Sequence, residues 1–242
     1  MAKAKSGECE SCGLWRICFP GRMAASGGRL AASGGRLARR VRIRKLKFAR
    51  GKALYRAGDE VECFYMIRSG CIKEVDESAD RRGSVINFAL PGEMLSLQSL
   101  GKTRSTTTSI AVVPSFVCSV PWAAFNRLCA ESPRVAAEFI RLIAKAWTPA
   151  RDLLTLIRDR EAVERVAGFL LNLSSRLQIR GVRGREFKLC MNRDDIAGYL
   201  GLRSETVSRC FTELGRRGLI AVRAKRVQLL QPAELRRVCL GE

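Results

Sequence analysis

Short runs of alternating apolar and polar residues, separated by glycine, occupy the chain from about residue 41 to residue 120. This alternation predicts half-buried strands, and turn signals roughly every 8–12 residues are typical of an antiparallel barrel or roll. Gly58-Asp59, Gly70 and Pro91-Gly92 mark the turns. The predicted strands lie within the segments RVRIRKLKF, CFYMIRSG, CIKEVDE, SVINFAL, SIAVV and SFVCSV.

After Pro121 the periodicity becomes helical. Ser132-Pro133 predicts a helix start, because a proline at the first helical position loses no hydrogen bond. Pro149 lies further along this helix and is expected to kink or divide it. Apolar residues recur along it at spacings of three, four or seven, which suits packing on a partner helix, although the stripe could equally lie on its own domain. These residues are Val135, Phe139, Leu142, Ala146, Leu153 and Ile157.

The remaining pattern predicts a small mixed domain. An amphipathic helix is expected from about Glu161 to Ile179, followed by a strand over 185–190. Asn192 to Gly218, NRDDIAGYLGLRSETVSRCFTELGRRG, then shows two short helical periods on either side of Gly201. Ser204 is expected to cap the second helix. A helix, a glycine turn and a second helix predict a helix-turn-helix, and Arg226 to Leu230 could form a strand of a wing behind it.

The second helix of this motif carries side chains suited to reading bases. Glu205, Ser208 and Arg209 fall at i, i+3 and i+4 on the polar face. Arginine donates two bonds to guanine, glutamate accepts from cytosine N4, and serine can do either. We expect backbone phosphates to be contacted by Arg203, Ser204, Thr206 and Arg216. The alternative is a solvated helical hairpin with a chance charge pattern.

Composition favours a DNA-binding protein. The net charge is +21 and 47% of residues are hydrophobic, which suits a globular protein that attracts polyanions. No run approaches the roughly 18 apolar residues of a membrane span, and no signal peptide is evident. We therefore expect a cytoplasmic protein that binds double-stranded DNA and not a membrane.

The chain has ten cysteines and no histidine, so any metal site is expected to use thiolates as ligands. Cys9, Cys12 and Cys18 have C-x2-C-x5-C spacing, which lets three thiols converge on a zinc ion or an iron–sulfur cluster. Zinc usually takes a second CxxC or a histidine pair, and the absence of both favours a cluster. The tandem repeat AASGGRL at 24–30 and 31–37 follows, and its Gly-Gly pairs indicate a flexible connector.

The chain resembles the CRP/FNR family of bacterial transcription regulators, and within it the FNR-type oxygen sensors. The motifs that carry this are CESCGLWRIC, AGDEVECFYMIRSG, PSFVCSVP, AVERVAGFLLNLSSR, MNRDDIAGYLGLRSETVSR and GLI. The resemblance implies an α+β fold. It comprises a cysteine-rich segment and connector at 1–40, an antiparallel, cyclic-nucleotide-binding-like β-roll at 41–130, a dimerisation helix at 131–160 and a winged helix-turn-helix at 161–242.

The resemblance also implies a mechanism. A 4Fe–4S cluster held by Cys9, Cys12, Cys18 and Cys118 would stabilise a homodimer under anaerobiosis, and oxygen would degrade the cluster and dissociate the dimer. Cys63, Cys71 and Cys129 compete with Cys118 as fourth ligand. The dimer would bind a promoter palindrome of TTGAT-type half-sites. Glu205, Ser208 and Arg209 match the E-x-x-S-R triplet with which the family reads such a half-site. RNA polymerase is the implied partner, with Asp80 to Ser84 as a candidate contact loop. The repeat lengthens the link from Cys18 to the roll relative to family members, which could alter oxygen sensitivity.

Two alternatives remain. A cyclic-nucleotide-responsive regulator of the same fold needs a glutamate for the ribose and an arginine for the phosphate, for which Gly92-Glu93 and Arg104-Ser105 are candidates. Thr106 stands where that branch has alanine. A cysteine-based redox enzyme or metal-buffering protein would use the C-x-x-C at Cys9-Cys12. This motif lacks the βαβ context of dithiol oxidoreductases and leaves the helix-turn-helix unexplained, so we expect no enzyme.

Overall fold

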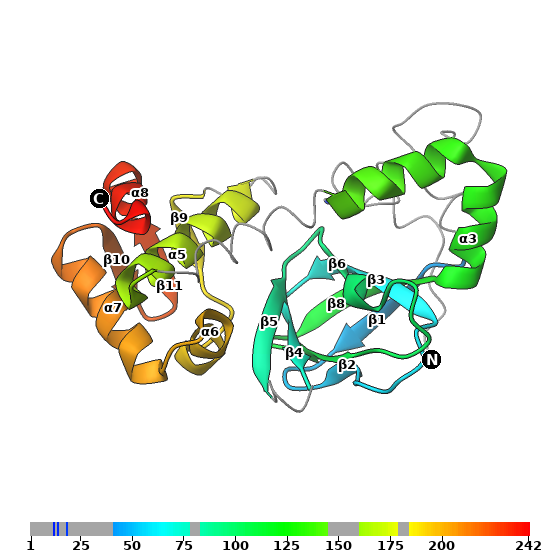
Figure 1. Ribbon diagram of the computed structural model, residues 1–242, viewed down its shortest axis with the longest axis horizontal. Coiled ribbons are helices and arrows are strands. Elements are labelled where there is room, and N and C mark those ends of the chain that lie inside the picture. The colour runs from blue at the N-terminus through cyan, green and yellow to red at the C-terminus, as the bar shows by residue number, and fades with distance from the viewer. Residues whose placement is uncertain are drawn as a thin grey trace. The chain divides into compact units, whose positions relative to one another are not determined.

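The computed structural model describes residues 12, 14, 18, 41–77, 83–144, 160–178 and 184–242 (Figure 1). The chain divides into two compact units, Met1–Asp80 with Phe88–Ala146, and Arg81–Asn87 with Trp147–Glu242. Ala146, Pro149, Leu153, Ile157, Cys9, the AASGGRL repeat and residues 80–82 of the candidate polymerase loop lie outside the described residues. None of the described helices combines the length and apolar character needed to cross a bilayer.

The roll consists of two four-stranded sheets, with strand orders β1-β8-β3-β6 and β2-β7-β4-β5. The registers of β1–β8, β3–β8, β3–β6, β2–β7 and β4–β7 are antiparallel, as predicted. Two very short strands, β2 and β6, were not expected, because two or three residues carry no periodicity. The bounds are β1 Arg44–Phe48, β2 Ala53–Tyr55, β3 Cys63–Ser69, β4 Ile72–Asp76, β5 Ser84–Ala89, β6 Met94–Leu95, β7 Thr107–Ala111 and β8 Ser115–Pro121, with the 3-10 helix η1 Leu97–Ser99.

The sheet that contains β3 and β8 is buried on both faces. Phe64 pairs with Val120 and belongs to a cluster completed by helical residues. Ile67 pairs with Val117, and both belong to a second cluster with residues of the other sheet. Successive strand residues point to opposite faces, so the two clusters lie on opposite sides of this sheet. One side therefore packs on helices and the other on the second sheet.

Helices cover the first of these faces. Helix α3 spans Trp122–Glu131, and residues 133–144 are helical after Ser132, as predicted. Phe139 is buried, and its ring centroid lies 4.6 Å from that of Phe125 and 5.5 Å from that of Phe64. Leu142 packs against the same cluster. Phe139 and Leu142, which we predicted on a dimer surface, therefore pack against their own roll, and the exposed large hydrophobic side chain among residues 133–144 is Ile140, at 65%.

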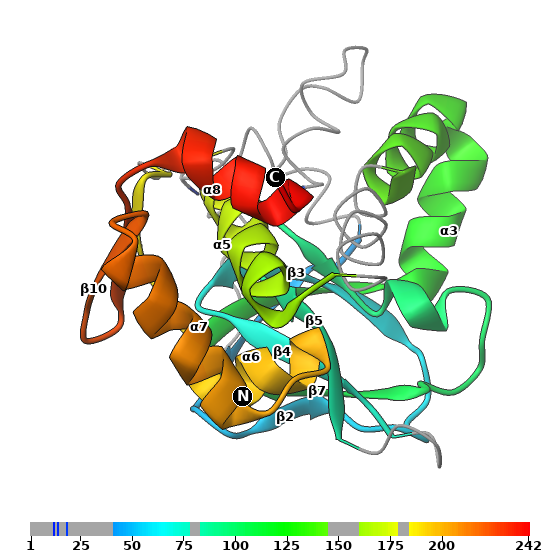
Figure 2. The same cartoon turned by 60° about the vertical axis from the view of Figure 1, so that its left-hand side comes forward.

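The second unit is a winged helix-turn-helix. A three-stranded antiparallel sheet of order β10-β11-β9 packs with helices α5 to α8, of which α8 was not predicted. In Figures 1 and 2, α5 lies between α8 on one side and α6 and α7 on the other. The bounds are α5 Ala162–Gln178, β9 Glu186–Lys188, α6 Arg193–Leu200, α7 Ser204–Arg216, β10 Ile220–Arg223, β11 Arg226–Leu229 and α8 Pro232–Leu240.

Local sequence explains where α6 and α7 begin and end. Asn192 accepts a hydrogen bond from the Asp195 amide at 2.7 Å, and the Asp195 carboxylate accepts the Asn192 amide, which forms a capping box. Gly201 ends α6 with φ of 64°, a left-handed conformation that glycine adopts without strain. The N-cap of α7 is Arg203, so Ser204 is the first helical residue and not the cap that we predicted.

Candidate nucleic-acid interface and thiolate site

Helix α7 separates an apolar face from a polar one. Val207, Phe211 and Leu214 are buried against the unit's core, whereas Glu205, Ser208 and Arg209 are exposed together. Among the described residues, neither Glu205 nor Arg209 has an ion-pair partner. Both charges are therefore available to a ligand, as base reading requires.

Hydrogen bonds within α7 hold its polar side chains close to the helix. Ser208 Oγ donates to the Ser204 carbonyl at 3.0 Å, which leaves its lone pairs free to accept. Arg209 Nη2 donates to Thr206 Oγ1 at 3.5 Å, a long contact that a bidentate bond to guanine would readily replace. The structure thus brings all three predicted base-reading residues to one exposed face.

The predicted phosphate contacts divide by position. Arg203, Ser204 and Thr206 lie at the amino end of α7, where the helix dipole favours anions. Arg216 lies in the last turn, about 18 Å away along the axis. Arg216 forms a 3.1 Å ion pair with Glu213. Hydrogen bonds from Arg216 and Arg217 lower the pKa of Glu213 to about 2. Arg216 therefore remains the least supported of the four.

A residue that we did not predict couples the two helices. The Arg193 guanidinium lies 3.4 Å from the centroid of the Phe211 ring, so the first residue of α6 stacks on the buried face of α7. Burial lowers the pKa of Arg193. This cation–π contact helps set the angle at which α7 is presented. Its sequence signal was weak, because Arg193 and Phe211 are far apart along the chain.

Two predicted cluster ligands border one apolar surface. Cys118 lies opposite Met66 on β3 and Lys45 on β1, on the sheet face covered by the helices. Cys18 packs against the same core cluster as Cys118. Cys12 is half-buried, like Cys18 and Cys118. Within the described ranges, no group of three or more His, Cys, Asp or Glu side chains is placed to hold a metal ion. Soft thiols beside an apolar cluster nevertheless fit the donor chemistry of an iron–sulfur group.

The competing cysteines differ in position. Cys71 is fully buried, and its amide donates to Ser115 Oγ. Cys63 precedes Phe64 on β3 and therefore faces away from the helix-covered side. Cys129 of α3 does border the same cluster as Cys118. Burial raises the pKa of Cys63 and of Cys129, which disfavours the thiolate at both. Cys129 is thus the one competitor whose position suits a ligand.

The cyclic-nucleotide candidates make other contacts. Arg104 is exposed, and its Nη1 donates to the Gly58 carbonyl at 2.7 Å. A Glu93 carboxylate oxygen accepts the Leu90 amide at 2.8 Å. Inside the roll, Tyr55 donates to the buried Glu74 at 2.6 Å, and burial raises the pKa of Tyr55. These described side chains do not present a free glutamate and arginine to a nucleotide.

Comparison with known proteins covers both units. Residues 45–132 match the cyclic nucleotide-binding domain, and residues 164–238 match the Crp-like helix-turn-helix domain. The chain is 32% identical to the transcriptional regulatory protein btr of Bordetella pertussis, over 92% of this chain and 89% of that protein. It is 30% identical to the transcriptional activator protein Anr of Pseudomonas protegens, over 94% and 90%. The fumarate and nitrate reduction regulatory protein of Escherichia coli is 33% identical, over 77% and 74%.

The fold agrees with a solved structure. FixK2 from Bradyrhizobium japonicum superposes with a TM-score of 0.73 and 25% identity, covering 81% of this chain and 96% of that one. Both matched domains occur here in the same chain, with the helix-turn-helix C-terminal to the roll. The chain therefore belongs to the CRP/FNR family, whose members are DNA-binding transcription regulators and not enzymes.

Proposed function

We propose that this chain is an oxygen-responsive regulator in which Cys9, Cys12, Cys18 and Cys118 hold a 4Fe–4S cluster. The observation that carries the proposal is that Cys18 and Cys118, far apart in sequence, border one apolar cluster. Similarity to the fumarate and nitrate reduction regulatory protein and to Anr supports it. When bound, the cluster would supply an oxygen-labile link between the amino-terminal segment and the roll.

The chain's own residues connect these thiols to the helix that begins at 133. Val135 and Phe139 of that helix are buried in the cluster that Cys18 and Cys118 border. A change in how the thiols are held would alter packing on this face. The same helix exposes Ile140 on another face, and this supports the proposal that the helix transmits the change to a second protomer. To shift the ratio of the two conformational states from 1:99 to 99:1, the cluster would have to bind one state about 5.5 kcal/mol more tightly than the other.

The dimer would present two α7 helices to a palindrome. Glu205, Ser208 and Arg209 would read TTGAT-type half-sites about one DNA turn apart. Arg203, Ser204 and Thr206 would contact adjacent phosphates, and RNA polymerase would contact the roll near residues 80–84. The dimerisation helix at 131–160 and the cluster segment at 1–40 are part of the same proposal.

The test compares two cysteines that border the same cluster. Protein purified without air should be brown, contain iron and sulfide, and shift a palindromic duplex until air is admitted. Cys118→Ser should abolish the chromophore and the air-sensitive shift, whereas Cys129→Ser should retain both. The reverse result would make Cys129 the fourth ligand. Colourless, iron-free protein that still binds its operator would refute oxygen sensing through a cluster.

A second candidate follows from the match of residues 45–132 to the cyclic nucleotide-binding domain. Cyclic nucleotide would be added to the cluster-free protein in the same DNA shift assay. A large gain in specific DNA binding would show that the protein responds to a nucleotide and not to oxygen. We expect no gain, because Arg104 and Glu93 are engaged elsewhere.

A further inference from the structure

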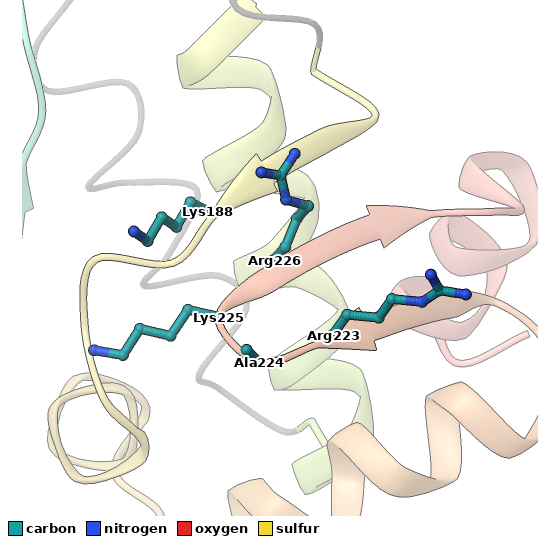
Figure 3. A pocket seen from close by; sticks show the side chains of 5 residues that line it. All are labelled: Lys188, Arg223, Ala224, Lys225 and Arg226. Carbon is teal, nitrogen blue, oxygen red and sulfur yellow. The ribbon is translucent and has the colours of Figure 1, made fainter.

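One lysine of the roll does not place its charge in solvent. Figure 3 shows the ordinary arrangement at the tip of the β10–β11 hairpin, where Lys188 and Lys225 extend from the backbone and both are exposed. Water and salt screen such charges. Lys45 of β1 differs, because its side chain is half-buried and its Nζ atom is buried. A buried ammonium costs free energy unless a negative charge lies beside it, so Lys45 points to an anion at this position.

Strand pairing places Lys45 beside Cys118. The two residues are partners in the β1–β8 register. Partners in an antiparallel pair point to the same face, and their Cβ atoms lie about 4.5–5.5 Å apart. Cys118 borders the core cluster on this face together with Cys18. The Lys45 side chain therefore lies next to the sulfur that we propose as the fourth ligand of the iron–sulfur cluster.

The charges around this ammonium favour a negative charge on Cys118. Burial and the positive charge of Arg68 on β3 both lower the pKa of Lys45, and Cys118 opposes these two effects. Lys45 and Arg68 thus bring two cations to the neighbourhood of one thiol. A thiolate that ligates iron is anionic, and so is an iron–sulfur cluster held by four thiolates. The site is therefore electrostatically suited to a ligated Cys118.

The next lysine on the same face of β1 provides a comparison. Lys47 pairs with Phe116, two residues before Cys118, and its Nζ atom lies 5.7 Å from the centroid of the Phe116 ring. Both side chains are exposed, so solvent screens the charge of Lys47. Lys45 and Lys47 share a strand, a face and a charge. They differ in the burial of Nζ and in the partner across the strand.

We infer that Lys45 is a positioning residue whose buried ammonium provides the counter-charge for the Cys118 thiolate when that thiolate holds the cluster. The inference rests on the proposed function, because it needs a ligated Cys118. A cation beside the cluster would favour its reduced state, since net charge and surroundings set the reduction potential of such clusters. In the cluster-free protein the buried ammonium would instead lower stability, because a neutral thiol compensates it less than a thiolate does.

The test removes the charge and keeps the stem of the side chain. Lys45→Met in the full-length protein is compared with Lys47→Met as the matched control. In protein purified without air, Lys45→Met should raise several-fold the rate at which a chelator removes iron. It should also shift the midpoint potential of the cluster to a more negative value. Lys45→Arg, which keeps the charge, should return both quantities toward those of the parent, and Lys47→Met should match the parent.

Thermal unfolding of the cluster-free proteins separates charge from packing. Lys45→Met should unfold there at the same temperature as the parent or a higher one. Parent-like iron loss and potential in Lys45→Met, or equal changes in Lys47→Met, would overturn the inference. Faster iron loss with an unchanged potential and a less stable cluster-free protein would also overturn it, because Lys45 would then act through packing. A parent without iron would refute the proposed cluster as well, whereas a brown parent with a parent-like Lys45→Met variant would refute this inference alone.

Discussion

At the scale of single residues, exposure separates the side chains that we propose to read DNA from those that build the domain. Arg209 lies on the exposed face of α7 and makes only a 3.5 Å contact with Thr206, whereas Phe211 is buried under Arg193. Arg209 can therefore be replaced without disturbing the packing of the core. This makes it suited to a test in which binding changes and stability does not.

Arg209→Ala should weaken binding to the cognate palindrome by about 1–3 kcal/mol, because alanine cannot form the bidentate bond to guanine. Binding to random DNA should change little. Competition gel shifts with both duplexes measure the difference, and Arg236→Ala on α8 provides the charge control. Equal weakening on cognate and random DNA would contradict a base-reading role.

Ala224 is a second informative position, because its φ is 53° in the wing turn. A left-handed conformation costs an L-residue roughly 1–2 kcal/mol, and glycine avoids that cost but loses more entropy on folding. Ala224→Gly should therefore stabilise the second unit by about 0.5–1 kcal/mol. Gly218→Ala, at φ of 69°, should have the opposite sign. Thermal unfolding of both variants measures this, and destabilisation by Ala224→Gly would show that the turn is unstrained.

At the scale of elements, the helix that begins at 133 has two faces with different roles. Phe139 points into an aromatic cluster with Phe64, Trp122 and Phe125. Its neighbour Ile140 is 65% exposed. The heptad-like stripe in the sequence combined positions that pack on the roll with positions beyond the described residues. Periodicity located an apolar face but did not identify what covers it.

Ile140→Glu should shift the anaerobic protein toward monomer and weaken operator binding, while the unfolding of the cluster-free monomer stays unchanged. Phe139→Ala should instead cost about 3–5 kcal/mol of stability, because it leaves a cavity in the core. Sedimentation at several concentrations and thermal unfolding distinguish the two effects. If Ile140→Glu leaves self-association intact, then this helix face does not join the protomers.

At the scale of the whole molecule, a strongly basic chain contains two units with separate cores. Residues 24–37, which carry the repeat, lie outside the described residues, and the Gly-Gly pairs in their sequence predict a flexible connector. Any role of the repeat would concern the path from the cysteines to the roll.

Deleting residues 31–37 should leave the thermal unfolding of the protein unchanged, because one AASGGRL copy and all described core residues remain. The rate at which air bleaches the chromophore is the second measurement, since the deletion shortens the link after Cys18. Failure of the shortened chain to fold would show that the repeat is structural.

Local patterns were sufficient for the longer strands of the roll, for the helix-turn-helix and for the exposed polar face of α7. Alternation in the segment CFYMIRSG, the glycine turn at Gly201 and the polar spacing of Glu205, Ser208 and Arg209 express conformational preferences that act over a few residues. The family assignment followed from the same motifs and was confirmed over both units. Ser204 as N-cap was wrong by one residue, because helix ends depend on backbone bonding that several polar residues could satisfy.

The sequence by itself determined the order of the longer elements, the basic character of the chain and the side-chain chemistry of its thiols and of α7. Only the tertiary structure decided that Cys18 and Cys118 share one apolar surface and that Phe139 packs inward while Ile140 is exposed. The physical reason is range. Backbone preferences and periodicity act between near neighbours, whereas these juxtapositions arise from burial and strand pairing between segments distant in the chain.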